Sequence, residues 1–333
     1  YLVTSDAFSP LMVMGGVYFL LMDRLSSRVQ FVILGLLAGG MHLARAEGMV
    51  WLLLAVGSLW MTGKRDLSSY LYLVVGYLIA FGPWMVRNLH VFGNPLGPSV
   101  IKPLWLTEYN QLFIYPPDQL DFTSWWETGI KEIIGGRIWA LGVNFGTIVA
   151  VQGGIFLLPL VIWGAFRSWE RMIIRIGAAA WGILFLVMSI LFPYQGARGT
   201  FFHAAAALQP LIWALAAGGF HEFISWGVAK RSWDSGQARK FLGSGFLIIL
   251  TILTLLVVKQ RVLGDTWRRP IWNAYYYQYQ QIEDALAEKG VREDQVVMVK
   301  NPPGYFLTSQ RPAVSVPYGG MEAVSLAAEQ YRV

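Results

Sequence analysis

The stretch MIIRIGAAAWGILFLVMSILFPYQGARGTFFHAAAALQPLIWALAAGG, residues 172–219, places two long apolar runs on either side of a short polar turn. Each run approaches the roughly 20 apolar residues that a helix needs to cross a hydrocarbon core about 30 Å thick. The whole chain agrees, because 55% of its 333 residues are hydrophobic, 14% are charged and none is cysteine. This composition predicts a mainly α-helical, polytopic transmembrane bundle.

Eight apolar runs are predicted to span the membrane. They cover residues 7–22, 30–44, 48–62, 67–84, 145–166, 172–192, 204–225 and 241–258. The second and third are only 15 residues long, and a helix of that length rises about 22 Å, less than the core thickness. The LARAEG stretch between them, residues 43–48, is therefore expected below the lipid headgroups. GLLAG, residues 35–39, has the small-xxx-small spacing that packs membrane helices together.

The distribution of Lys and Arg predicts the orientation of these spans. Turns at 23–29, 63–66, 167–175 and 226–240 hold 11 Lys and Arg in 35 residues, whereas segments 45–47, 85–144 and 193–203 hold 6 in 74. The positive-inside rule places the first set in the cytoplasm and the second set outside the cell membrane. The net charge of +6 is dispersed over short turns, with no cationic groove of the kind that binds nucleic acid.

Two regions are predicted along the chain. Residues 1–258 form the membrane region, with an outward loop at 85–144, in which 123–142 is either a helix lying in the interface or the outer end of the next span. Residues 259–333 are expected to form a small extracytoplasmic α/β domain. Its predicted elements are a helix over 272–286, strands at 296–299 and 313–316 separated by the breaker NPPG, and a last helix over 321–331. The chain opens on Tyr1 and stops at Val333, so we expect a fragment of a longer protein.

Three polar positions stand close to or within the predicted spans. Arg45 and Glu47 in LARAEG would be costly at membrane depth unless they pair or line a wet cavity, which makes them functional candidates. The alternative is a local ion pair that closes a helical hairpin, each charge suiting its helix end. Asp6 precedes the first span, and on its own chemistry it is most often a helix N-cap.

Two further arginines on the predicted outer side are candidates for the site. Arg87 and Asn88 follow Pro83, which is expected to kink or stop the fourth span. The Arg87 side chain either snorkels to the interface or contacts a lipid phosphate. Arg198 lies in the turn FPYQGARGTFFH, residues 192–203, where Pro and Gly bend the backbone. A bent cationic turn suits a phosphate, and an ordinary loop would have the same composition.

Three longer stretches carry a family resemblance. They are LAGGMHLARAEGMVWLLL, GYLIAFGPWMVRNLHVFGNPLGP and ARGTFFHAAAALQPLIWALAAGG. Their order along the chain resembles the bacterial class C glycosyltransferases (GT-C fold) that use polyprenyl-phosphate sugars, close to the protein mannosyltransferases and aminoarabinose transferases. The tail VVMVKNPPGYFLTSQRPAVSVP resembles the small extracytoplasmic domain of bacterial members.

The resemblance implies an inverting transfer of a sugar from a lipid-linked donor to a glycan, lipid or protein acceptor outside the inner membrane. A carboxylate would deprotonate the acceptor hydroxyl while cations stabilise the departing lipid phosphate. Arg198 is the main candidate for that phosphate, with Arg87 and Arg45 as helpers. The residues expected to line the site are Tyr194, Gln195, His203 and Asn88. Several family members also bind a divalent metal, but the four histidines have no ligand spacing, so no metal site is assigned.

The principal catalytic base of that family lies in the first outward loop, and this chain is expected to begin beyond it. Asp6 and Glu47 are the acidic candidates in this sequence, and neither is assigned as the base. A lipid or solute transporter would also bury charges in a cavity, but it should show two related halves with broken helices. A non-catalytic membrane scaffold with a partner-binding tail is the other alternative.

Overall fold

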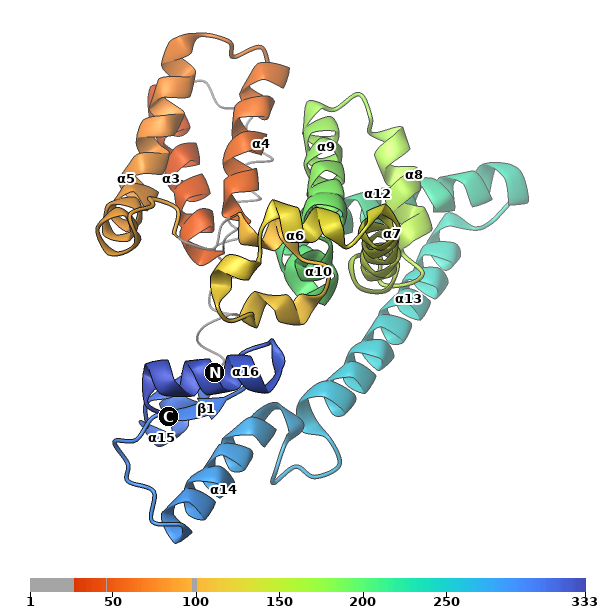
Figure 1. Ribbon diagram of the computed structural model, residues 1–333. Helices are drawn as coiled ribbons and strands as arrows, with labels where there is room; N and C mark the ends of the chain where they lie inside the picture. Colours follow the sequence, from red (N-terminus) through yellow and green to blue (C-terminus); the bar gives the residue numbers. More distant parts are fainter. Residues whose placement is uncertain (1–26, 46, 98–100) are drawn as a thin grey trace. The chain divides into compact units, whose positions relative to one another are not determined.

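The computed structural model describes residues 27–45, 47–97 and 101–333. Asp6 and the predicted span at 7–22 lie outside these residues. The described chain is mainly helical and divides into two compact units, which Figure 1 draws together. Unit 1 comprises residues 1–109 and 125–232, and unit 2 comprises residues 110–124 and 233–333. Unit 2 therefore contains the tail together with residues 110–124 and the last apolar helix, Ser235–Val258 (α13).

Five helices are long and apolar enough to cross a membrane, which agrees with the membrane class expected from composition. They are Leu67–Phe92, Ile130–Gln152, Met172–Leu191, Pro193–Arg231 and Ser235–Leu263. Three apolar helices are shorter: Arg28–Ala44 (α3), Gly48–Met61 (α4) and Leu158–Arg167 (α8). The predicted span at 145–166 is wrong as one helix, because Ile130–Thr147 (α7) and the π-helical turn Ile148–Gln152 (η5) end at Gly153, before α8 begins.

Glycines bring the membrane helices of unit 1 into close contact. A Cβ at Gly35 of α3 would lie 1.9 Å from the Leu73 carbonyl oxygen of Leu67–Phe92 (α5), and a Cβ at Gly76 would lie 2.0 Å from the Val32 oxygen. These distances confirm that GLLAG packs helices, because only glycine allows the two backbones to approach this closely. The same arrangement joins α8 to Gln209–Arg231 (α12), where a Cβ at Gly219 would lie 1.9 Å from the Leu160 oxygen.

Helix ends in α3 and α5 follow from capping residues. Ser27 caps α3 in a capping box with Gln30, and the Asp66 carboxylate accepts a hydrogen bond from the Ser69 amide at the start of α5. α5 continues through Pro83, so Pro83 is not a stop. It ends at Gly93, whose φ of 69° is readily adopted by glycine.

The apolar centre of unit 1 lies between α3, α4, α5 and the segment after residue 172. Trp51, Leu59 and Leu73 are almost fully buried there together with residues of Met172–Leu186 (α9). α9 continues into a π-helical turn, Val187–Leu191 (η6). The segments that follow are Pro193–Gln195 (α10), Gly196–Thr200 (η7), Phe201–Ala205 (α11) and Ala206–Leu208 (η8).

Unit 2 contains the two predicted strands. Val297–Val299 (β1) and Ala313–Ser315 (β2) pair in parallel, Val297 opposite Ala313. Parallel strands need a crossover connection, and here it is the helix Pro302–Ser309 (α15). NPPG was expected to break structure, but it starts this helix. Asn301 caps the Gly304 amide at 3.3 Å, and proline is well tolerated in the first helical turn.

The remaining elements of unit 2 are helical. Ala274–Glu288 (α14) and Gly320–Tyr331 (α16) lie close to the predicted ranges. Tyr279 and Tyr305 pack edge to face at 5.3 Å in the small core beside β1. Residue Ile114, from within the loop at 85–144, bridges to Tyr318, so part of this loop pairs with the tail.

Candidate functional site

The turn that carries Arg198 is bent at a glycine. η7 is π-helical, and Gly199 within it has a φ of 121°, a backbone conformation that side-chain-bearing residues rarely adopt. The bend exposes the Arg198 side chain, and its guanidinium carbon lies 5.1 Å from the centre of the Tyr109 ring. This cation–π contact holds the guanidinium by its face, which leaves the N–H groups at its edge available to a ligand.

Tyr194, one turn before Arg198, packs against α7. Its ring stacks on Trp139 with centroids 5.8 Å apart. Gly136 makes room for the Tyr194 hydroxyl, because a Cβ there would lie 2.4 Å from that oxygen. Glu108, Glu132 and Arg137 all interact electrostatically with this tyrosine. The Tyr194 hydroxyl therefore lies among both acidic and basic side chains.

Arg137 is fixed by α7 and by a tryptophan. Its Nη1 donates a hydrogen bond of 2.9 Å to the Ile133 carbonyl oxygen, and its guanidinium carbon lies 5.2 Å from the Trp125 ring centre. Trp125 in turn packs on Trp105 at 5.6 Å. We use the name aromatic–cation cluster for two groups of contacts that the turn of α10 and η7 joins through Tyr194 and Arg198. They are the pair of Arg198 and Tyr109, and the group of Trp125, Arg137, Trp139 and Tyr194.

The ion pairs of the two arginines in the cluster decide what their donor edges can bind. Among the residues that the structure describes, neither Arg137 nor Arg198 forms an ion pair with a carboxylate. A guanidinium without a carboxylate partner has its donor edge open to an anion, and its planar fork matches a phosphate or a carboxylate. The aromatic faces beside it provide the flat apolar surface on which a sugar ring can pack. The arrangement can therefore bind an anionic group next to a sugar or an apolar group.

Arg45 and Glu47 form the local pair that the sequence left open. The Arg45 Nε donates to the Glu47 carboxylate between the end of α3 and the start of α4. The Glu47 side chain is 5% exposed and the Arg45 side chain 23%. The pair neutralises both charges across the hairpin. It is the local ion pair expected as the alternative to two charges that line a functional cavity.

Arg87 and Asn88 also make local contacts. The Arg87 guanidinium carbon lies 4.7 Å from the Trp84 ring centre, and its Nη1 donates to the Asn88 Oδ1 at 3.1 Å. The Asn88 side chain is buried and donates to the Pro95 carbonyl oxygen at 3.4 Å. The contacts of the described residues do not link Arg87, Arg45 and Arg198 to one another, so the structure does not assemble the predicted trio.

The other predicted site residues lie on the Arg198 turn. His203 is half-buried on α11, where its ring packs edge to face against Phe202 at 5.0 Å. Gln195 is half-buried at the end of α10. Tyr194 is tied to the aromatic–cation cluster by its ring contact with Trp139.

Sequence reasoning missed Glu108 and Tyr109. It included Glu132 and Arg137 only as part of 123–142, the segment expected to be either an interfacial helix or the outer end of the next span. A useful signal was available, since Arg137 is a single charge within an otherwise apolar run. The contact between Tyr109 and Arg198 joins residues 89 positions apart, and no local pattern encodes such a pairing. Within the described ranges no group of three His, Asp or Glu side chains could hold a metal ion.

Comparisons with protein-family models, with curated proteins and with solved structures find no match to this chain. The resemblance to the class C glycosyltransferases therefore stays a prediction, carried by the sequence stretches given above.

Proposed function

We propose that this chain is a membrane glycosyltransferase of the class C type, which moves a sugar from a polyprenyl-phosphate donor to an acceptor hydroxyl on the outer face of the inner membrane. The observation that carries this proposal is the exposed Arg198 guanidinium, which stacks on Tyr109 and has no carboxylate partner among the described residues. Its charge suits the lipid phosphate that leaves during transfer.

In the proposed reaction a carboxylate removes the proton of the acceptor hydroxyl, the acceptor oxygen attacks the anomeric carbon, and the bond from that carbon to the phosphate oxygen breaks. The phosphate leaves with the electron pair, and Arg198 stabilises its negative charge. Glu108 and Glu132, which interact electrostatically with Tyr194, are the described carboxylates that we propose for this step. Glu47 is a weaker candidate because Arg45 already neutralises it. Asp6 stays a prediction.

The aromatic rings of the cluster supply the second part of the site. Tyr109 lies against Arg198, while Trp139 and Tyr194 stack on each other where the same turn begins. Aromatic faces of this kind pack on the C–H surfaces of a sugar. The donor would then place its phosphate at the arginine and its sugar against the rings. The transferred sugar in this proposal is a hexose or a pentose. A divalent metal, if the reaction uses one, has no ligand set among the described residues.

A transfer assay tests this proposal directly. Full-length protein in lipid nanodiscs is incubated with radiolabelled polyprenyl-phosphate sugars and candidate acceptors. Arg198→Ala removes one charged hydrogen-bonding partner, worth about 1.5 to 3 kcal/mol, so transfer efficiency should fall roughly tenfold to 150-fold. Arg198→Lys keeps the charge without the planar fork and should lose less.

Arg65 provides the matched control. Its guanidinium carbon also lies over an aromatic ring, 4.9 Å from the centre of Trp60, but between α4 and α5 on the predicted cytoplasmic side. Arg65→Ala should leave transfer unchanged. Equal transfer by the wild type and Arg198→Ala would contradict the assignment of Arg198 to the phosphate. No transfer by the wild type with any donor would contradict the proposed glycosyltransferase activity.

A transporter is the second candidate, because one structural observation favours it. The apolar helix that begins at Ile130 breaks between Gln152 and Leu158, and the one after α9 bends at Gly199. Discontinuous helices are common at the binding sites of transporters. Proteoliposomes loaded with a labelled polyprenyl-phosphate sugar separate the two functions, since a transporter moves the lipid between leaflets with its sugar intact, whereas the enzyme requires an acceptor and releases the lipid phosphate.

A further inference from the structure

The last apolar helix, α13, lies open to lipid along its whole length. Its central stretch is the most hydrophobic among the five candidate spans, and α13 buries none of its residues against the described part of the chain. A helix that is apolar on every side and lacks protein around it is stable inside a bilayer, where lipid tails cover it. The residues that follow Val258 are therefore the ones that meet the membrane surface.

The helix continues for one further turn beyond its apolar run. Lys259–Leu263 (η9) extends α13 as a π-helical turn, and Gly264, with a φ of 69°, ends it. Five helical residues rise roughly 7 Å, which is comparable with the headgroup layer of about 5 to 8 Å on each side of the hydrocarbon core. The chain therefore turns at the level of the lipid headgroups.

The residues after this turn form a closed loop that joins α13 to α14 (Figure 1). We call residues 264–273 the exit loop; its last three residues are the short helix Ile271–Asn273 (η10). A Cβ at Gly264 would lie 2.5 Å from the Ile271 side chain, so the end of the loop packs back on its beginning. Within the loop the Arg269 amide donates to the Thr266 carbonyl oxygen at 3.3 Å. The closure keeps the loop beside the end of the membrane helix.

The exit loop presents tryptophan and arginine side chains to its surroundings. Trp267 is 80% exposed and Trp272 is 51% exposed, whereas tryptophan in folded proteins is highly buried on average. Arg268 and Arg269, which follow Trp267, are exposed as well. Tryptophan rings collect at the headgroup level of membrane proteins, and arginine keeps its stem against apolar groups while its charged end stays with the phosphates. This combination fits a lipid surface.

The charge around the loop favours an anionic surface. Residues 259–273 contain four basic side chains, Lys259, Arg261, Arg268 and Arg269, and one acidic side chain, Asp265. None of the four basic side chains forms an ion pair within the described ranges, so their charge is available to a partner. An anionic bilayer presents negative charge at the height at which α13 places the loop. The continuity of the loop with this helix therefore favours lipid over a second protein as its partner.

We propose that the exit loop binds the headgroups of anionic phospholipids, with Arg268 and Arg269 at the phosphates and Trp267 at the boundary with the acyl chains. The bound lipid holds the start of α14 at the membrane surface. This contact belongs to unit 2 alone, and it does not depend on the chain being a glycosyltransferase.

Quenching by spin-labelled lipids tests the proposal. The chain has no cysteine, so Thr266→Cys provides one thiol in the exit loop for a fluorescent label. Glu288→Cys is the matched control, because it lies at the other end of α14, roughly 21 Å beyond the start of that helix. The full chain is reconstituted in phosphatidylcholine nanodiscs that contain a small fraction of a lipid with a nitroxide near its headgroup. That lipid is either phosphatidylglycerol, which is anionic, or phosphatidylcholine, which is not.

The label at residue 266 should be quenched about fivefold more by the anionic lipid. This is the ratio that ~1 kcal/mol produces, the contribution of one Lys or Arg near an anionic surface. The label at residue 288 should show no such preference. Raising the salt concentration to about 1 M shortens the screening length to about 3 Å, so the preference at residue 266 should then disappear.

Variants separate the charge of the loop from its tryptophan. Arg268→Gln combined with Arg269→Gln should remove most of the preference for the anionic lipid, whereas Arg268→Lys combined with Arg269→Lys should keep it. Lys289→Gln removes an exposed charge at the end of α14 and should leave the preference unchanged. Trp267→Ala should weaken quenching by both lipids alike, because the ring sets the depth of the loop and not its charge.

Three results would overturn the proposal. The first is equal quenching of the label at residue 266 by the two lipids, and the second is a preference that survives the replacement of both arginines by glutamine. The third is loss of the preference when unlabelled polyprenyl phosphate is added but not when the same amount of unlabelled phosphatidylglycerol is added, which would assign the loop to the lipid-linked donor. None of these measurements depends on transfer activity, so the outcome is distinct from a failure of the proposed enzyme.

Discussion

Replacing Gly35 by alanine should destabilise the membrane region, because the added methyl group would enter the close contact between α3 and α5. The new Cβ would lie 1.9 Å from the Leu73 carbonyl oxygen, 2.7 Å from the Tyr77 amide nitrogen and 2.9 Å from the Leu73 carbonyl carbon. All three are backbone atoms, so no side chain can rotate away. A carbon and an oxygen approach no closer than about 3.3 Å, which means that α3 and α5 must separate by roughly 1.4 Å at this point.

The energy follows from what holds two helices together in a membrane. Helices in lipid associate through close packing and not through the hydrophobic effect, and a gap of 0.5 to 1 Å already forfeits about a quarter to a half of the dispersion energy of the atoms across it. Overpacking of this kind costs roughly 1 to 3 kcal/mol or more. Alanine regains about 0.5 to 1 kcal/mol through its better helix propensity. We expect a net loss of about 2 kcal/mol for Gly35→Ala.

Gly57 is the matched control, because it also lies within an apolar helix but a Cβ there would meet no atom within 4 Å. Gly57→Ala should therefore stabilise the protein slightly. Both variants are compared with the wild type by reversible unfolding in mixed micelles, with tryptophan fluorescence as the signal. A Gly35→Ala variant as stable as Gly57→Ala would show that α3 and α5 are not packed backbone to backbone, and the reasoning would fail.

Three further predictions concern single polar groups. Asn144 is 1% exposed and donates to the Ser189 Oγ at 2.9 Å. Asn144→Leu removes this interhelical hydrogen bond, so the free energy of unfolding in the same assay should fall by about 1 kcal/mol. An unchanged free energy would mean that α7 and η6 are not joined there. Hydrogen bonds from Arg311 lower the pKa of Glu283, so this pair stabilises unit 2 above about pH 4.3 and the effect disappears as the pH falls through the lower folded-state pKa. Glu283→Gln should abolish that acid dependence in hydrogen exchange of α14 and α15, and an unchanged profile in the variant would contradict the assignment. Serine hydroxyls and an amide lower the pKa of Asp66 to about 2, so its cap on α5 should persist to pH 4. Asp66→Ala should then speed hydrogen exchange in the first turn of α5 while Asp66→Asn keeps it protected, and equal exchange in both would exclude the cap.

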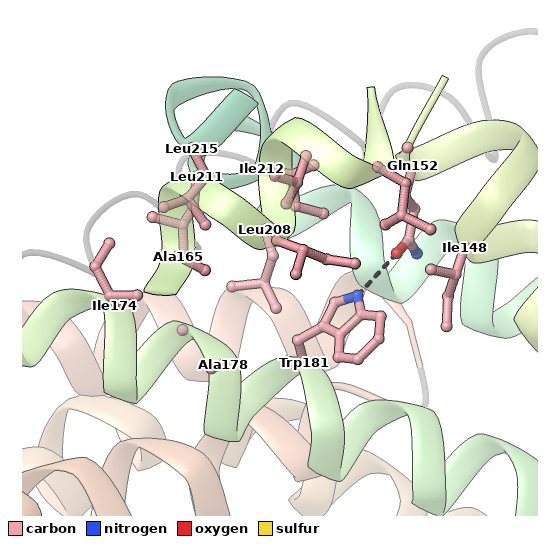
Figure 2. Close-up of a pocket in the computed structure, with 15 residues that line it drawn as sticks. Ile148, Gln152, Ala165, Ile174, Ala178, Trp181, Leu208, Leu211, Ile212 and Leu215 are labelled. Atoms are coloured by element: carbon pink, nitrogen blue, oxygen red, sulfur yellow. Dashed lines mark hydrogen bonds between the residues drawn. The ribbon is translucent and has the colours of Figure 1, made fainter. Parts of the chain in front are cut away.

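The class of the protein could be predicted from the sequence because hydropathy acts locally. A run of apolar residues is driven into lipid whatever its neighbours are, so the helices 28–44 and 48–61 lie within two residues of the expected spans. The helix 67–92 begins at the expected residue but runs eight residues past the expected end at 84, because Pro83 does not stop it. The small-xxx-small spacing of GLLAG and the short apolar runs of the two tail strands are also local patterns, so both could be read from the sequence. The break after Gln152 was missed although Gly153 and Gly154 follow it, because the runs on both sides are apolar and were read as one span. Gly154 has a φ of 51° in the turn, and Gln152 is held by hydrogen bonds with Trp181, drawn in Figure 2, and with Gln209.

The candidate site could be predicted only in part. Arg198 and Tyr194 stand in a turn whose Pro and Gly content shows that it bends, and the sequence alone was enough to single them out. It also left the pair of Arg45 and Glu47 undecided, because two charges two residues apart can face each other or a cavity, and only the geometry of the hairpin brings them together.

The partners of these residues depended on tertiary structure. Tyr109 reaches Arg198, and Glu108 and Arg137 reach Tyr194, from elements far away along the chain. The unpaired amide of Gln152 is likewise visible only in the folded chain, because a donor is unsatisfied only with respect to everything packed around it. Hydropathy and turn chemistry are properties of neighbouring residues and can be read in order, whereas charge pairing and cavity shape are properties of surfaces that exist only after the helices have packed.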